Sequence, residues 1–165
     1  MNKQHSTPKK RSPRTFERGK AYAVHCLSKK MHTKKELYDK LYSKDYPDEI
    51  CVKIIEYLEE LSYIDDQDYA ERYAKDAHNL KKIGVMRIKR ELVGKGIDIE
   101  IINNLFDELD LDFEKSLASI IDIKSQRSDL TDYKEKRRLI AHLMRRGYTY
   151  SEISAVLSKK ENEID

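Results

Sequence analysis

The chain has 165 residues, of which 39% are hydrophobic and 38% are charged, and its formal net charge is +3. This hydrophobic fraction with nearly balanced charge excludes an intrinsically disordered chain, and no apolar run approaches the roughly 18 residues of a membrane-spanning helix. The two cysteines form no C-x-x-C pair, and the N-terminus lacks the apolar stretch of a secretory signal. We therefore expect a cytoplasmic protein that has neither a disulfide scaffold nor a membrane partner.

The first 17 residues are predicted to form a basic, disordered tail. Residues 1–20 carry seven Lys or Arg residues and one Glu, so the basic excess of the chain lies here. A basic arm attracts phosphate backbones or acidic surfaces without reading sequence. The simpler interpretation is a solvated leader interrupted by Pro8 and Pro13. Both interpretations stay open from the sequence alone.

After the tail, the sequence repeats itself at a spacing of 51 residues. Three sets of apolar residues and one set of basic residues recur at this spacing, and we call each set a column. The apolar columns are Leu37/Ile88/Leu139, Leu41/Leu92/Leu143 and Ile54/Leu105/Val156, and the basic column is Lys44/Lys95/Arg146. Self-similarity at such a period is typical of stacked helical repeats, in which each copy is one supersecondary unit. The spacing predicts three units, over residues 18–64, 65–110 and 111–160.

Each unit is predicted to contain three helices. The first is a longer helix, at about residues 16–31, 66–82 and 112–126. The second carries apolar pairs four residues apart in the Leu37 and Leu41 columns, which is the spacing of one helix face. The third carries an apolar stripe, and no segment alternates with the period of a strand. The sequence therefore predicts an all-α fold of three tandem three-helix repeats, stacked into an elongated, curved molecule.

The turn between the second and third helices has its own signals. Gly96 and Gly147 stand where a left-handed C-terminal cap is expected, and Asp98 and Thr149 follow as N-caps. Thr149 and Glu152 form a capping box, as do Thr33 and Glu36. In the first repeat, Asp45 replaces the glycine and Pro47 occupies the cap position. Because Asp tolerates left-handed backbone less well than Gly, a slightly reshaped turn is expected there.

No catalytic or metal-binding pattern stands out. The five histidines are scattered, and neither a G-x-S-x-G motif nor a Gly-rich phosphate loop is present. Asp65 and Asp66 could resemble an acid/base pair, but consecutive acids at a helix start are far more often a cap. We expect a monomeric protein that is not an enzyme and needs no cofactor or metal.

The basic residues of the second and third repeats are the candidate partner-binding residues. Several recur at helical spacing, so one face could be cationic and could follow a polyanion or an acidic groove; the alternative is a solvated face balanced by acids. The candidates are Lys81, Lys82, Arg87, Arg90, Lys95, Arg137, Arg138, Arg145 and Arg146.

Several motifs together resemble one known family. Residues 63–70 read YIDDQDYA, residues 84–97 read GVMRIKRELVGKGI, residues 33–41 read TKKELYDKL, and residues 143–148 read LMRRGY. In this order they resemble the RecX family over about residues 18–158. Thr33 replaces the usual Ser with the same capping chemistry, Asp45 replaces a Gly, and residues 29–31 lack the usual Arg.

The resemblance implies a regulator of the RecA recombinase. RecX proteins bind in the groove of the RecA–DNA filament and usually inhibit its ATP hydrolysis, strand exchange and co-protease activity. The basic face and the tail could also contact DNA. A rival interpretation is a helix-turn-helix DNA-binding module in which Ser151 and Glu152 face the groove, although the equivalent helix at 99–109 is acidic, which suits DNA poorly. A third interpretation is a helical adaptor for another protein.

Overall fold

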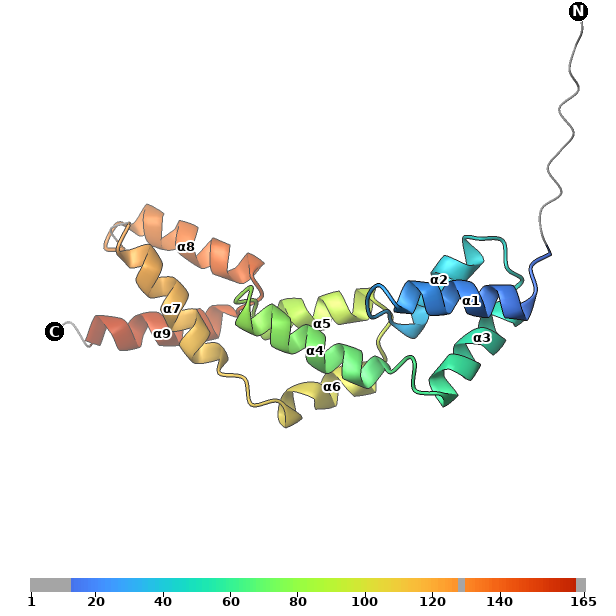
Figure 1. Ribbon diagram of the computed structural model, residues 1–165. Coiled ribbons are helices and arrows are strands. Elements are labelled where there is room, and N and C mark those ends of the chain that lie inside the picture. The colour runs from blue at the N-terminus through green and yellow to red at the C-terminus, as the bar shows by residue number, and fades with distance from the viewer. Residues whose placement is uncertain (1–12, 128–129, 163–165) are drawn as a thin grey trace, which may run out of the picture. The chain divides into compact units, whose positions relative to one another are not determined.

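The structure is a computed structural model that describes residues 13–127 and 130–162 (Figure 1). These residues form helices and no strand, and none of the helices is long and apolar enough to cross a membrane. In chain order the helices are α1 (Phe16–Leu27), α2 (Lys34–Tyr42), α3 (Asp48–Glu60), α4 (Asp66–Asn79), α5 (Val85–Gly94), α6 (Ile99–Glu108), α7 (Phe113–Ser125), α8 (Tyr133–Arg145) and α9 (Tyr150–Asn162).

The chain divides into two units after Ile64. The first unit holds α1–α3, which pack around one cluster of buried side chains that includes Ala23, Leu41 and Ile54. The small Gly19 lets α1 approach α3, because a Cβ at this position would lie 2.4 Å from Ile54 Cδ1. The first repeat therefore has a core of its own.

The second unit holds two repeats, α4–α6 and α7–α9, each with its own buried cluster. The first cluster is centred on Ile88, Leu92 and Leu105, and the second contains Leu143 and Ile153. Phe113, at the start of α7, packs against both clusters. The prediction of an all-helical fold with three tandem three-helix repeats is confirmed, whereas the elongated, curved shape stays a prediction.

The apolar columns form the centres of the three cores. All nine residues are buried, and the most exposed of them, Leu139, is only 6% exposed. They lie on the second and third helices of each repeat, which explains the register of 51 residues. Each of these side chains is buried in the core of its own repeat. The residues predicted as a 17-residue tail lie largely outside the described part of the chain, although α1 already begins at Phe16.

The turn between the second and third helices has the same left-handed backbone in all three repeats. Gly96 has φ +78° and Gly147 has φ +94°, as their positions predict, and Asp45 has φ +63°. The expected reshaping of the first turn is therefore absent at this residue: Asp45 adopts the conformation of the glycines. In each turn the amide of the residue that follows the left-handed residue donates back to the buried leucine column, as Tyr46 N does to Leu41 O at 3.4 Å.

Side-chain caps fix most helix starts where the sequence places them. Asp65 Oδ1 accepts from Gln67 N at 2.8 Å and from Asp68 N at 3.0 Å, so it caps α4. The Thr149–Glu152 capping box is reciprocal, with Glu152 N donating to Thr149 Oγ1 at 3.2 Å and Thr149 N donating to Glu152 Oε2 at 2.6 Å. These bonds satisfy amides that have no partner within the helix.

Two of the longer helices end earlier than predicted. Helix α1 ends at Leu27 rather than near residue 31, and α4 ends at Asn79 rather than near residue 82. In α4 the reason is Lys82, whose φ of +52° reverses the chain, while Ile83 N donates back to Ala77 O at 3.1 Å. This pattern terminates a helix in the way a C-terminal glycine does.

Candidate functional site

The described residues contain no group of three or more His, Cys, Asp or Glu side chains that could hold a metal ion. The Asp65–Asp66 pair lies at the start of α4, where Asp65 is the helix cap and Asp66 is buried. The candidate binding groups of the second unit are instead its basic side chains, several of which lie around one contact between its two repeats.

We call this contact the joint: the α4–α5 loop, residues 80–84, meets the α8–α9 turn, residues 146–148. Gly84 N donates to Arg146 O at 2.8 Å, and Met86 N donates to Gly147 O at 3.2 Å. A Cβ on Gly84 would lie 2.5 Å from the carbonyl carbon and oxygen of Gly147. Two backbones therefore touch directly, and only a residue without a side chain fits between them.

Arg146 closes the joint from the side of the third repeat. Its guanidinium donates to the carbonyl oxygens of Lys81 and Lys82, with Nε 3.4 Å from the latter, and Tyr148 Oη donates to Lys82 O at 3.2 Å. These carbonyls follow the C-terminal end of α4, where the helix dipole favours a positive charge. Arg146 therefore has an intramolecular role that its basic column did not predict.

Five of the nine predicted cations come together at the joint. Arg87 packs against the other backbone, since a Cβ on Gly147 would lie 2.4 Å from Arg87 Cβ. Arg145 is exposed beside Arg146. We call this set the joint cluster: Lys81, Lys82, Arg87, Arg145 and Arg146. Burial, followed by the charges of Arg146, Lys124 and Arg145, lowers the pKa of nearby His142, which is consistent with a positive local potential.

The joint cluster continues along α5 through a hydrogen-bonded network. Glu91 accepts from Arg87 Nε at 2.8 Å and from the hydroxyl of Tyr73. Burial alone would raise the pKa of Glu91, but the bonds from Tyr73 and Arg87 hold it below its usual value. Burial, together with the bond to Glu91, raises the pKa of Tyr73 to about 12. Lys95 Nζ lies over the stacked rings of Tyr69 and Tyr73, at 5.4 and 5.5 Å from their centroids. Arg87 and Lys95 are thus held by their own chain.

The structure separates the remaining candidates from the joint cluster. Arg137 and Arg138 lie in the first half of α8, about 10 Å along the helix from Arg145. Arg138 pairs with Glu135, whereas Arg90, Arg137 and Arg145 are exposed and have no ion-pair partner among the described residues. Together with Lys81, which is also exposed, these three arginines are the candidate cations available to a partner.

Exposed apolar side chains accompany the cations, and the sequence analysis did not single them out. Leu80 is 77% exposed, Met86 57% and Met144 50%. Leu80 and Met86 flank the α4–α5 loop, and Met144 precedes the two arginines of the α8–α9 turn. The sequence contains a signal for the exposure of two of them, because Met86 and Met144 lie outside the apolar columns of their helices.

Comparison with known proteins identifies the family. The family models for RecX match all three repeats: the first three-helix domain over residues 20–58, the second over 65–104 and the third over 123–157. Together the matches span more than half of the chain. The chain belongs to the RecX family. The resemblance seen in the motifs is thereby confirmed.

Individual relatives support the same family assignment. Regulatory protein RecX of Mycolicibacterium smegmatis is 33% identical over 153 residues, which are 88% of this chain and 81% of that protein. Regulatory protein RecX of Clostridium botulinum is 30% identical over 144 residues, which are 85% of this chain and 67% of that protein. The crystal structure of RecX from Lactobacillus salivarius superposes with a TM-score of 0.79 at 27% identity, covering 87% of this chain and 95% of that one. RecX is a family of regulatory proteins and not of enzymes.

The structure of the α9 start also bears on the rival DNA-binding interpretation. That interpretation places Ser151 and Glu152 of α9 in a DNA groove. Both are exposed, but the Glu152 carboxylate is tied to Thr149 N and Oγ1 at 2.6 and 2.8 Å at the helix start. A carboxylate held at the N-terminus of α9 would face DNA phosphates with like charge.

Proposed function

We propose that this chain binds the RecA recombinase filament and inhibits its ATP hydrolysis, strand exchange and co-protease activity. The observation that carries the proposal is the match of all three repeats to RecX domains. Regulation by this family acts through a partner protein, and the geometry of the second unit supports a particular surface for that partner.

The surface consists of the joint cluster, Arg90 and the exposed apolar residues beside them. Interfaces are enriched in Arg and Met and are depleted of Lys and Glu. Arg90 and Arg145 are exposed cations, and Met86 and Met144 add apolar area of the kind that a partner can cover. The surface therefore combines charge with apolar contact.

The backbone bonds of the joint make this surface rigid. Gly84 N and Met86 N donate across the two repeats, and Arg146 adds bonds to the α4 terminus. A surface that is ordered before binding loses little conformational entropy when the partner arrives. Acidic groups of the filament, or phosphates of its DNA, would complement the exposed arginines.

The first experiment is a titration of the chain into DNA-stimulated ATP hydrolysis by RecA of the same organism. We expect inhibition well below one molecule of chain per RecA, because a regulator bound along or at the end of a filament affects several protomers. No inhibition at equimolar, correctly folded protein would contradict the proposal, and sequence-dependent DNA binding in its place would favour the helix-turn-helix alternative.

A charge-reversal pair locates the surface. Arg90→Glu with Arg145→Glu should weaken inhibition at least tenfold, since both side chains are exposed and pair with no acid in the described structure. Lys53→Glu is the matched control, because Lys53 is an exposed cation on α3 outside this surface. Circular dichroism would verify that all variants stay helical. Equal inhibition by the double variant and the control would refute the assignment of the surface.

A further inference from the structure

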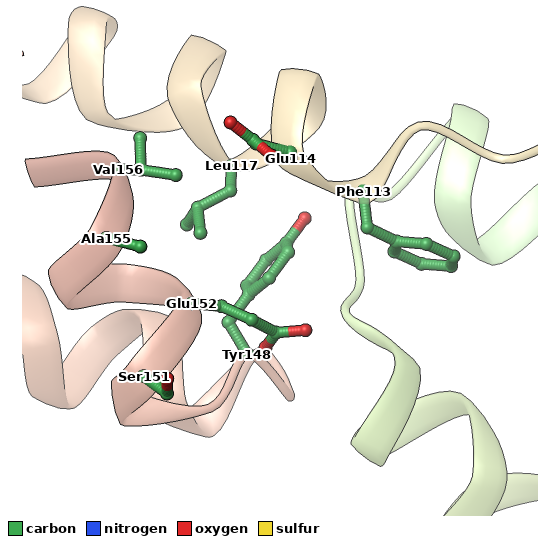
Figure 2. A pocket seen from close by; sticks show the side chains of 8 residues that line it. All are labelled: Phe113, Glu114, Leu117, Tyr148, Ser151, Glu152, Ala155 and Val156. Atoms are coloured by element: carbon green, nitrogen blue, oxygen red, sulfur yellow. The ribbon is translucent and has the colours of Figure 1, made fainter. Parts of the chain in front are cut away.

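The third repeat contains an open groove between its first and third helices. The cavity has a volume of about 340 Å³ between α7 and α9 (Figure 2). Leu117, Tyr148 and Val156 are buried at its base. Its full lining is Phe113, Glu114, Leu117, Tyr148, Ser151, Glu152, Ala155 and Val156. A volume of this size is at the lower end of the range for ligand-binding pockets, and it accommodates a large side chain.

In the first repeat, aromatic side chains of the first and third helices contact each other. Phe16 at the start of α1 packs edge-on against Tyr57 of α3, with ring centroids 5.7 Å apart. Lys20 Nζ lies over both rings, 5.6 Å from the Phe16 centroid and 5.3 Å from that of Tyr57. Two aromatic rings and one cation therefore close the space between the first and third helices of that repeat.

The third repeat begins in the same way but leaves this space open. Helix α7 also starts with Phe and Glu, but the ring of Phe113 turns to the second repeat, 4.5 Å from His78 and 6.0 Å from Phe106. Figure 2 shows Phe113 directed away from Leu117 and Val156. In the 51-residue register, Lys159 replaces Tyr57, and it pairs with Glu114 across the helices. Tyr57 thus has no aromatic counterpart in the third repeat, and Phe113 lines one edge of the groove without closing it.

The charge of the groove indicates what could enter it. Two of its lining residues, Glu114 and Glu152, are acidic, and the one cation that pairs with them in the described structure, Lys159, lies outside the lining. The segment that leads into α7, residues 98–114, contains seven acidic residues and no Lys or Arg. The matching occupant is an aromatic or large apolar side chain with a Lys or Arg beside it, which is the combination that fills the first repeat. Cations next to an acidic rim gain attraction, and aromatic side chains contribute the largest buried area.

The groove is continuous with the surface proposed above. Tyr148 lines the groove with its ring, and its hydroxyl donates to Lys82 O at the joint. We propose that the groove between α7 and α9 receives an aromatic side chain, flanked by Lys or Arg, from the protein component of the RecA filament. This inference rests on the proposed function and adds to it a second contact of opposite charge. Two adjoining contacts of opposite sign fix the orientation of a partner better than one.

The test fills the groove from within. Ala155→Phe places a ring where the partner's ring would bind, while Ser158→Phe adds the same ring to an exposed position of α9 that does not line the groove. Binding is measured by co-sedimentation with RecA filaments on single-stranded DNA. We expect Ala155→Phe to weaken binding at least tenfold, as loss of an interface hot spot does, and Ser158→Phe to change it less than twofold.

A charge pair tests the acidic rim. Glu114→Gln should weaken filament binding several-fold, whereas Glu108→Gln, at an exposed acid of α6 outside the groove, should not. If Ala155→Phe fails to fold by circular dichroism, a photo-crosslinking residue at Ser151 replaces it. That residue should cross-link to RecA, and the same residue at Ser158 should not.

The outcomes separate the two proposals. A wild-type chain that does not bind the filament refutes the proposed function, and this inference with it. Weakened binding in the Arg90→Glu, Arg145→Glu variant, with wild-type binding in Ala155→Phe and Glu114→Gln, refutes the groove alone. Loss of binding in Ala155→Phe with binding retained in Ser158→Phe supports the groove.

Discussion

Gly84→Ala tests the joint between the second and third repeats. The backbone of Gly84 has φ −78° and ψ 163°, which any residue adopts, so alanine causes no local strain. The new Cβ would lie 2.5 Å from Gly147 C and O and 2.7 Å from Tyr148 N. Because all three are backbone atoms, no side chain can move aside, and the α4–α5 loop must separate from the α8–α9 turn.

The expected loss of stability follows from these contacts. Separation breaks the bonds Gly84 N–Arg146 O and Met86 N–Gly147 O, which together contribute about 1–3 kcal/mol. Overpacking adds about 1–3 kcal/mol if the turn does not move far enough. The smaller entropy of alanine in the unfolded chain returns about 0.4–1 kcal/mol. The net effect is a decrease of about 3 kcal/mol in the free energy of unfolding of the second unit.

Gly94→Ala is the matched control in the same helix. Gly94 is the last residue of α5, and a Cβ there meets nothing within 4 Å. Alanine should therefore stabilise the helix by about 0.5–1 kcal/mol. Urea unfolding followed by circular dichroism measures both variants, and hydrogen exchange reports the Met86 amide. Equal urea midpoints for Gly84→Ala and Gly94→Ala, with the Met86 amide still protected, would refute the account of the joint.

Two further changes probe the same region. Arg146→Ala removes the hydrogen bonds to the carbonyls of Lys81 and Lys82. It should lower the free energy of unfolding by about 1.5–3 kcal/mol, which is the range for hydrogen bonds to a charged group. An unchanged urea midpoint would show that Arg146 does not stabilise the joint. Burial, and then the charge of Lys82, lowers the pKa of His78, so the folded state favours the neutral ring. The resulting contribution to the free energy of unfolding is complete above the unfolded pKa of about 6.5, and it is lost as the pH falls through the lower pKa of the folded state. The urea midpoint should therefore decrease between pH 7 and pH 5, with a shallower decrease in His78→Leu; parallel decreases would exclude His78 as a source.

The helices and their repeat could be predicted because they depend on local chemistry. The Leu41 column repeats because each copy must bury its own core, and Gly96 and Gly147 mark turns that require left-handed backbone. Asp45 shows that this turn is determined by its neighbours as well as by its residue type. The end of α4 was misplaced because Lys82 gives no sequence signal for its positive φ.

The roles of the basic residues could not be predicted, because they depend on tertiary contacts. Lys44, Lys95 and Arg146 occupy one column of the repeat, yet Lys44 is exposed, Lys95 lies over two tyrosine rings and Arg146 binds carbonyls of the preceding repeat. The sequence around Arg146 does not indicate that its side chain binds residues more than 60 positions earlier in the chain. Equivalent positions in a repeat share a place in the local fold and not a function.

The joint also affects how such a chain can change over evolutionary time. Its two repeats touch through main-chain atoms, and main-chain atoms are the same whatever side chains surround them. Substitutions around the contact therefore leave its two main-chain hydrogen bonds intact, provided that Gly84 and Gly147 persist, whereas its side-chain bonds depend on Arg146 and Tyr148. Constraint on the main-chain geometry therefore falls on these two glycines, and exposed neighbours such as Met86 and Arg145 can be exchanged without altering the backbone contact beneath them.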